Sequence, residues 1–157
     1  QITDNIEYNT LIANITNSYI EAGRFVLVLI QQISHGKLLS SMIPGSIFLS
    51  GKSPKKKREE TIQKLKNKEI SCIVSSVIFD EGIDIQILDT VILGGQGKSS
   101  TRALQRIGRI LRIYPGKTTA TAIDFRVHQK YLLQHSIKRE KMYKTEEEYD
   151  IEHIDEN

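Results

Sequence analysis

The chain has a single cysteine among its 157 residues, so it can hold neither a disulfide framework nor a metal site built from several thiolates. Cys72 lies in an apolar run, residues 70–74, and we expect a buried, inert thiol there. No apolar stretch has the length needed to span a bilayer, and no signal peptide heads the chain. We therefore expect a cytoplasmic protein with no membrane partner. Since Gln1 is not methionine, we also expect a fragment or a processed chain.

The usual sequence marks of metal or nucleophilic catalysis are also missing. The histidines are His35, His128, His135 and His153, and no two of them have metal-ligand spacing together with a carboxylate. No nucleophile-elbow sequence is present. We therefore predict no metal ligands in this chain and no local covalent nucleophile.

Charge is unevenly distributed, although the formal net charge is only +3. Between positions 52 and 68 there are two acidic residues, Glu59 and Glu60, against eight basic ones: Lys52, Lys55, Lys56, Lys57, Arg58, Lys64, Lys66 and Lys68. Residues 144–157 are instead predominantly acidic. This asymmetry predicts a surface that faces nucleic acid, and a solvated acidic tail at 144–157 that follows a folded domain at 1–143.

Apolar strands alternate with helical patterns along the chain. Helical spacing from Leu11 to Ile20 stops at Gly23, a predicted C-terminal cap. Ser34 and the Ser53–Pro54 pair are predicted helix starts. The expected strands are residues 25–30, 46–49, 70–74, 89–93 and 118–125, and the expected helices are 34–42, 53–68, one beginning at 99 or 100, and 129–143. The pattern predicts an α/β fold, a three-layer parallel β-sheet flanked by helices on both faces.

Polar residues and glycines follow the predicted strands. In parallel sheets, ligands collect at the carboxyl ends of the strands. The residues expected at that edge are Gln31, Gln32, Ser50, Gly51, Lys52, Ser75, Ser76 and the glycine-rich stretch 94–97.

The stretch from Gly94 to Ser99 resembles a P-loop, because it follows a strand, precedes a helix and ends in Lys98-Ser99. Its spacing is wrong, since Ile92 stands where the first glycine of that motif belongs. A small P-loop kinase is therefore a secondary hypothesis, and an ordinary glycine-rich turn is the simpler interpretation.

Three arginines, Arg106, Arg109 and Arg112, recur every third residue and alternate with apolar residues. On a helix this spacing places them on one face. Guanidinium groups keep their charge and match phosphate oxygens in a two-pronged fashion. The alternative is a solvated amphipathic helix.

Three further clusters have phosphate-binding or nucleotide-binding chemistry. Gly82 permits a positive φ or a close approach, and Asp84 can accept a hydrogen bond from a ribose hydroxyl, although turn capping is the alternative. The hydroxyls and amides of Ser75 and Ser76 can hold phosphate oxygens, and ordinary loop residues are the alternative. The start of the basic helix, with Lys52 and Arg58, can form an anion site of low sequence specificity, and a solvated charged face is the alternative.

The order of these clusters resembles the second RecA-like domain of superfamily 2 helicases. The matching motifs, in chain order, are Val28–Gln32, Ser50-Gly51 with Arg58, Val74–Ser76 with Glu81–Asp84, and Gln105–Arg112. The match covers about residues 24–125. Gln105 and Leu111 make the chain more similar to XPB-type and phage recombination helicases than to DEAD-box proteins. Those helicases act on DNA, and a bacterial or phage setting with roles in recombination or repair fits them.

The resemblance assigns roles to individual residues. It implies arginine fingers at Arg109 and Arg112 and nucleotide contacts at Gln105, Gly82 and Asp84. It implies a strand-binding surface formed by Gln31, Gly51, Lys52, Arg58, Ser75 and Ser76. Ser76 replaces the usual threonine, and Asp80 stands near a position that is often basic. These departures affect individual contacts with the nucleic acid.

The resemblance also explains why the chain lacks a P-loop. In this family the P-loop and the magnesium ligands belong to the N-terminal RecA-like domain, which is the expected partner. The cofactor is then ATP with Mg²⁺, and the second partner is DNA, with RNA as the alternative. We expect an enzyme half that is inactive alone. A non-catalytic nucleic-acid-binding module remains a competing hypothesis, although such a module would need neither arginine.

Overall fold

The computed structural model describes residues 6–76, 87–94 and 121–124. Within them lie α1 (Ile6–Glu21), β1 (Val26–Leu29), α2 (Ile33–Met42), β2 (Ile47–Leu49), α3 (Lys55–Lys66), β3 (Cys72–Ser75), β4 (Thr90–Leu93) and β5 (Thr121–Asp124). The predicted arginine helix, the last helix and the acidic tail lie outside the described residues.

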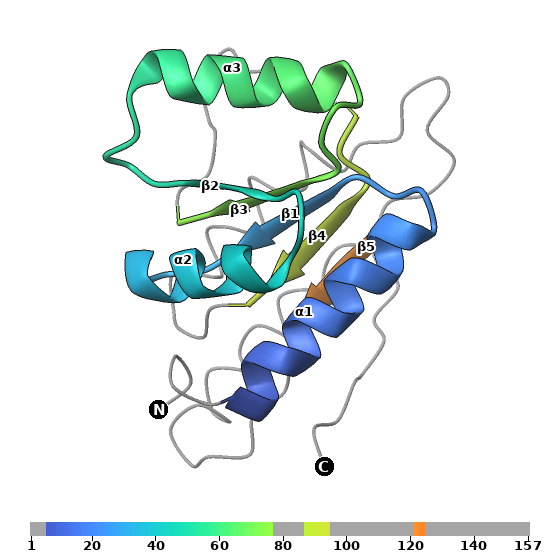
Figure 1. Ribbon diagram of the computed structural model, residues 1–157. Coiled ribbons are helices and arrows are strands. Elements are labelled where there is room, and N and C mark those ends of the chain that lie inside the picture. The colour runs from blue at the N-terminus through green and yellow to red at the C-terminus, as the bar shows by residue number, and fades with distance from the viewer. Residues whose placement is uncertain (1–5, 77–86, 95–120, 125–157) are drawn as a thin grey trace, which may run out of the picture.

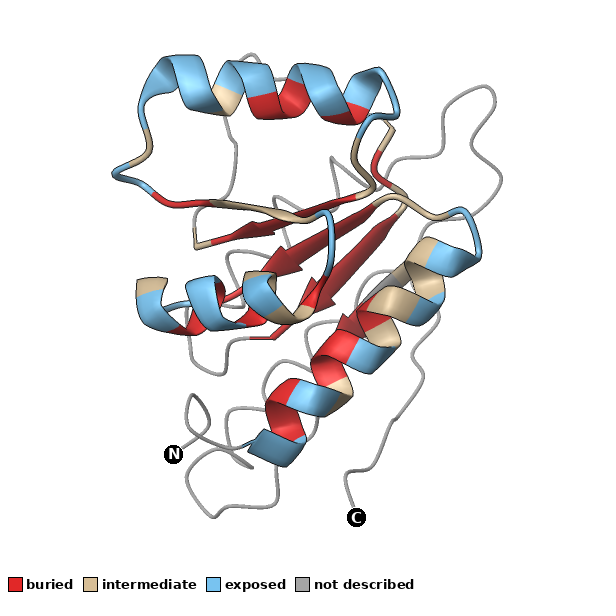
Figure 2. Cartoon of the chain, viewed as in Figure 1, coloured by how far each residue is buried: buried red, intermediate tan, exposed pale blue. Residues whose placement is uncertain are grey.

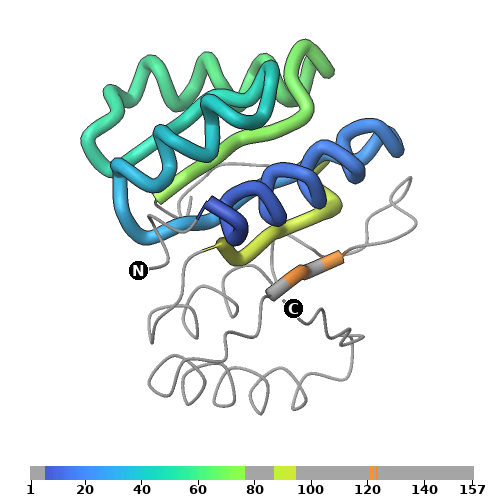
Figure 3. The backbone as a smooth tube through the Cα atoms, turned by 60° about the horizontal axis from the view of Figure 1, so that its bottom comes forward, coloured from blue at the N-terminus to red at the C-terminus, as the bar shows by residue number. Residues whose placement is uncertain are grey.

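The five strands form one parallel sheet in the order β2-β3-β1-β4-β5. The connection from β1 to β2 runs across the sheet in the opposite direction to the connection from β2 to β3. Because such crossovers are right-handed, α2 and α3 belong on opposite faces. Figure 1 shows the strands between α3 and the pair α1 and α2, and Figure 3 shows α1 and α2 from a second direction. The predicted three-layer α/β fold is confirmed.

The central strands are buried on both faces, which explains why their sequences are largely apolar. Val26 and Val28 of β1 belong to the core beneath α1 and α2, together with Ile12 and Leu39. Leu27, between the two valines, points to the opposite face and is also fully buried. Figure 2 shows burial across β1, β3 and β4, with the outer sides of the helices exposed.

Cys72 packs in the same core and is 1% exposed. Burial raises the pKa of its thiol to about 12, because the thiolate would lose its hydration. The expected buried, inert cysteine is confirmed.

Two predicted helix starts are wrong by one or two residues. Gln32, not Ser34, is the N-cap of α2, because the Gly36 amide already bonds to the Gln32 carbonyl at 3.0 Å. Pro54, not Ser53, is the N-cap of α3, since Ser53 Oγ instead accepts a hydrogen bond from the Ser50 amide at 2.9 Å. The predicted end after α1 is confirmed, with Gly23 at φ +83°.

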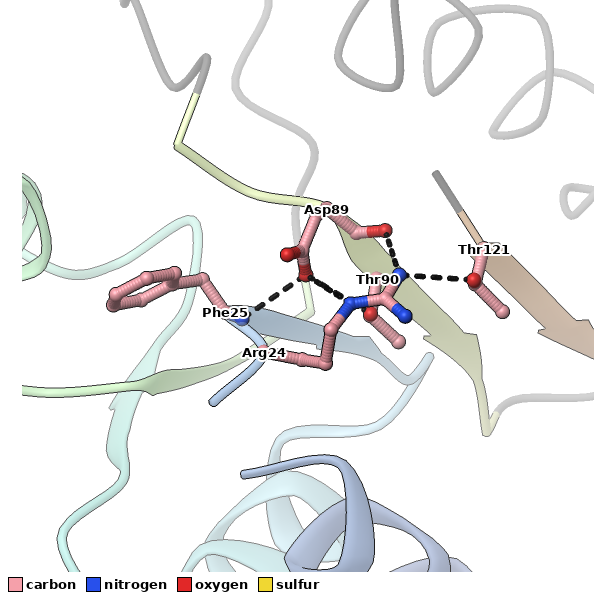
Figure 4. Close-up of polar contacts among 5 residues, drawn as sticks. All are labelled: Arg24, Phe25, Asp89, Thr90 and Thr121. Carbon is pink, nitrogen blue, oxygen red and sulfur yellow. Dashed lines mark hydrogen bonds and ion pairs between the residues drawn. The ribbon is translucent and has the colours of Figure 1, made fainter. Parts of the chain in front are cut away.

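At the amino edge of the sheet, Arg24 and Asp89 join three strands (Figure 4). Asp89 Oδ1 lies 3.1 Å from Arg24 Nε and accepts hydrogen bonds from the Phe25 amide and the Thr90 hydroxyl, each at 3.0 Å. Arg24 Nη2 donates to the Asp89 carbonyl at 3.0 Å and to Thr121 Oγ1 at 2.9 Å. This cluster fixes β1, β4 and β5 at the edge opposite to the predicted site.

Candidate functional site

The carboxyl edge of the sheet is held together by backbone bonds that continue beyond the strands. The Ile30 amide donates to the Ser75 carbonyl at 3.0 Å, and the Ser76 amide donates to the Leu49 carbonyl at 3.1 Å. The Gly94 amide donates to the Leu29 carbonyl at 2.8 Å. The segments that leave β1, β2, β3 and β4 therefore begin along one edge of the sheet, as predicted.

The turn after β2 is fixed by its two serines. Ser50 is buried, and its hydroxyl accepts a hydrogen bond from the Lys52 amide at 3.2 Å. The Ser53 amide donates back to the Ser50 carbonyl at 3.0 Å. Gly51 and Lys52 at the tip are exposed.

The other predicted strand-binding residues at this edge differ in exposure. Gln31 is exposed after β1, and Ser76 is half-buried after β3. Ser75 is fully buried, and its carbonyl bonds to Ile30. Thus Gln31, Gly51, Lys52 and Ser76 lie on the surface of the edge, and Ser75 lies beneath it.

Arg58 lies in the first half of α3, just beyond this turn. The residue is half-buried, and its Nε is buried with no hydrogen-bond partner among the described residues. The burial of Thr61, Ile62 and Leu65 fixes the rotation of α3 and carries Arg58 on the same side of the helix. A buried guanidinium nitrogen without a partner has a strong demand for an acceptor such as a phosphate oxygen.

Most of the basic side chains on α3 remain available to an anion. Lys55 and Lys56 form ion pairs with Glu59 and Glu60 at 3.8 and 4.0 Å, and all four side chains are more than half exposed. Exposed pairs of this kind contribute little to stability and are screened by salt. Lys52 and Lys57 form no ion pair within the part of the chain that the structure describes. An anion approaching the start of α3 therefore meets several available cations.

Sequence reasoning missed two buried contacts of α1 near this edge. Tyr8 donates its hydroxyl hydrogen to the Gly94 carbonyl at 3.1 Å, and Asn9 Oδ1 lies 2.8 Å from His35 Nε2. The partners are separated by 86 and 26 positions, so no local motif marks them. The available signal was a pair of adjacent residues with polar groups, Tyr8 and Asn9, in an otherwise amphipathic helix.

Several predicted residues lie outside the described residues: Gly82, Asp84, Gln105, Arg109 and Arg112. Within the described ranges, no group of three or more histidine, cysteine or acidic side chains is arranged to hold a metal ion. The helices described there include none long and apolar enough to cross a bilayer.

Comparison with known proteins relates this chain to helicases. The family model described as "Helicase conserved C-terminal domain" matches residues 9–114. Putative helicase 22 of Sulfolobus islandicus filamentous virus is 34% identical over 127 residues, which cover 78% of this chain and 22% of that protein. DNA 3'-5' translocase XPB2 of Sulfurisphaera tokodaii is 44% identical over 62 residues, 39% of this chain and 14% of that protein.

The ATP-dependent DNA helicase uvsW of Enterobacteria phage T4 is similar over almost the whole chain. It is 29% identical over 166 residues, which cover 92% of this chain and 33% of that protein. Its crystal structure superposes with a TM-score of 0.78 at 26% identity and covers 98% of this chain and 36% of that chain. The chain thus spans a third or less of the length of each of these three relatives.

Proposed function

Because the chain belongs to the helicase conserved C-terminal domain family, we propose that it is the C-terminal motor domain of an ATP-dependent helicase or translocase that acts on DNA. The observation that carries the proposal is the arrangement at the carboxyl edge, where the turn after β2 and the segment after β3 are bonded side by side through Ser76 and Leu49. This arrangement offers backbone amides, small side chains and cations on one surface.

The strand-binding surface consists of Gln31, Gly51, Lys52 and Ser76, with Arg58 beside it and Ser75 supporting it from below. Gly51 lets a sugar-phosphate backbone approach the turn closely, and Lys52 neutralises phosphate charge. Arg58 adds a guanidinium beside the turn, and its Nε has no hydrogen-bond partner among the described residues. These are contacts to the backbone, so binding depends little on base sequence.

ATP hydrolysis takes place across a cleft between this domain and the N-terminal RecA-like domain of the same protein. Arg109 and Arg112 act as arginine fingers that stabilise the charge on the γ-phosphoryl group in the transition state. Gln105, Gly82 and Asp84 contact the nucleotide. Mg²⁺ is held by ligands of the N-terminal domain and neutralises phosphate charge.

DNA is preferred over RNA on two grounds. The relatives named above include proteins described as a DNA helicase and a DNA translocase. Gln105 and Leu111 stand at positions where the motif is more similar to those of DNA-dependent helicases than to that of DEAD-box proteins. Roles in recombination or repair follow from the same likeness.

The test uses the full-length protein, in which this chain is joined to its upstream region. We expect single-stranded or branched DNA to stimulate ATP hydrolysis more than RNA of matched length. Arg109→Ala should lose turnover and keep DNA affinity, because its contact forms with the nucleotide. Equal stimulation of ATP hydrolysis by RNA would overturn the choice of DNA. ATP hydrolysis that no nucleic acid stimulates would overturn the motor function.

The strand-binding surface has a separate test with a matched control. Lys52→Ala should weaken DNA binding uniformly across sequences and reduce the slope of log affinity against log salt by about 1. Lys64→Ala, which removes an equally exposed lysine from the other end of α3, should change the affinity much less. If both variants bind alike, the surface is wrongly placed.

A non-catalytic nucleic-acid-binding module is the second candidate, favoured by the exposed cations at the start of α3. It predicts that Arg109→Ala changes nothing in the full-length protein. A small P-loop kinase predicts loss of nucleotide binding in Lys98→Ala, for which the motor function predicts a mild effect.

A further inference from the structure

The point where the chain leaves β4 is tied to α1 by a buried side chain. Tyr8 is 1% exposed, and its hydroxyl donates to the carbonyl of Gly94 at 3.1 Å. The hydroxyl has no bulk water with which to exchange this bond. Its loss would therefore leave the carbonyl short of a donor.

Gly94 is also fixed on its other sides. Its amide donates to the Leu29 carbonyl at 2.8 Å, which extends the pairing of β4 with β1 by one residue. A Cβ atom on Gly94 would lie 3.2 Å from Ile30 Cγ2 and 3.3 Å from Ile12 Cδ1. Gly94 is therefore held in place by close packing around its Cα atom, by its amide bond to Leu29 and by the bond from Tyr8 to its carbonyl.

The neighbouring residue fixes α1 itself. Asn9 is 2% exposed, and its Oδ1 lies 2.8 Å from Nε2 of His35, which is buried on α2. Two consecutive residues of α1 thus engage α2 and the end of β4. The first turns of α1 are thereby set in place relative to the carboxyl edge.

We propose that Tyr8 is a positioning residue for ATP hydrolysis, acting through Gly94. The chain continues from Gly94 into the sequence that carries Gln105, Arg109 and Arg112, so the Tyr8–Gly94 bond fixes the starting point of that sequence relative to the sheet. The inference rests on the proposed motor function. Because Tyr8 is 1% exposed, its effect is on the alignment of the groups that contact the nucleotide.

The test is Tyr8→Phe in the full-length protein, because phenylalanine keeps the ring packing and removes only the hydroxyl. Small misplacements of catalytic groups are costly, so we expect kcat for DNA-stimulated ATP hydrolysis to fall by about threefold to tenfold. The KM for ATP and the affinity for DNA should stay within error. A merely structural role for Tyr8 would not separate kcat from the other two quantities.

Thr16→Val is the matched control. Thr16 is a fully buried residue of the same helix, and its hydroxyl donates to the Ile12 carbonyl at 2.7 Å, within α1. Thr16→Val should lower the melting temperature by about as much as Tyr8→Phe does, and it should leave kcat unchanged. Gly94→Ala, which crowds Ile30 and Ile12, perturbs the same joint independently and should lower kcat as Tyr8→Phe does.

The outcomes separate this inference from the function on which it rests. A wild-type protein without nucleic-acid-stimulated turnover contradicts the proposed function. An active wild type with unchanged kcat in Tyr8→Phe contradicts the inference alone. Equal losses of kcat in Tyr8→Phe and Thr16→Val would also overturn it, because a general loss of stability would then explain both.

Discussion

His35 makes the stability of the fold depend on pH. It is 3% exposed, and burial lowers its pKa below the ordinary value of 6.5, because the charged ring would lose its hydration. The unfolded chain therefore binds a proton more readily than the native chain once the pH falls below that value. The contribution of the neutral ring is fully present above pH 6.5 and is lost as the pH falls towards the native pKa.

We predict that the free energy of unfolding decreases below about pH 6.5, by at most about 1.4 kcal/mol per pH unit from this residue. Urea unfolding at several pH values between 7.5 and 5 measures the slope. His35→Gln, which keeps a polar side chain opposite Asn9, should show a shallower slope. His128, His135 and His153 are present in both proteins, so a slope unchanged by the substitution would exclude His35 as its source.

Individual residues were predictable from sequence where one force dominates. The apolar neighbours of Cys72 predicted its burial, and the end of a helical pattern predicted the helix end at Gly23. Ser34 and Ser53 were wrongly assigned as caps because a serine hydroxyl has several competing acceptors and donors nearby, and Ser53 bonds to Ser50 instead. The pairing of Asn9 with His35 depends on how two helices pack, which no local pattern records.

At the scale of elements, Gly36 allows α2 to approach the sheet closely. A Cβ atom there would collide with the Phe48 ring and lie 2.8 Å from Ile30 Cδ1. Alanine is ordinarily better than glycine in a helix by about 1 kcal/mol. Here the overpacking cost of about 1–3 kcal/mol exceeds that gain.

We therefore predict that Gly36→Ala lowers the free energy of unfolding by up to about 2 kcal/mol, measured by urea denaturation. In a double-mutant cycle, Phe48→Leu should make the alanine less costly, because the smaller side chain leaves room for the methyl group. Strict additivity of the two substitutions, or a stabilising Gly36→Ala, would show that the ring does not limit the approach of α2.

The strands were more predictable than the ends of the helices. The apolar runs around β1, β3 and β4 predicted each strand to within one or two residues, since strands buried on both faces consist largely of apolar side chains. The contact of Arg24 with Asp89 and Thr121 was not predictable, because it joins residues 65 and 97 positions apart. Its residues precede or begin their strands and so lie at the amino edge, but only the order β1-β4-β5 makes them neighbours.

For the molecule as a whole, the most useful prediction was the common edge. Once the strands are parallel, every residue that follows a strand lies at the same side of the sheet, so Gln31, Lys52 and Ser76 come together without any knowledge of strand order. Which strands are neighbours required the structure. The pairing of β2 with β3 brings the turn at Gly51 next to Ser76, whereas the sequence alone allowed other orders.

The proposed division of an ATPase between two domains gives the last prediction. This 157-residue chain has no P-loop of the required spacing, because Ile92 occupies the place of its first glycine. An arginine finger accelerates hydrolysis only when another surface holds the phosphates and Mg²⁺.

We therefore predict that the isolated chain, with DNA and Mg²⁺-ATP, releases phosphate at the background rate in a steady-state assay. The same chain joined to its upstream region should turn over ATP, and Arg109→Ala should abolish that gain. Robust turnover by the isolated chain that Lys98→Ala removes would instead assign the phosphates to residues 94–99 and contradict the two-domain motor.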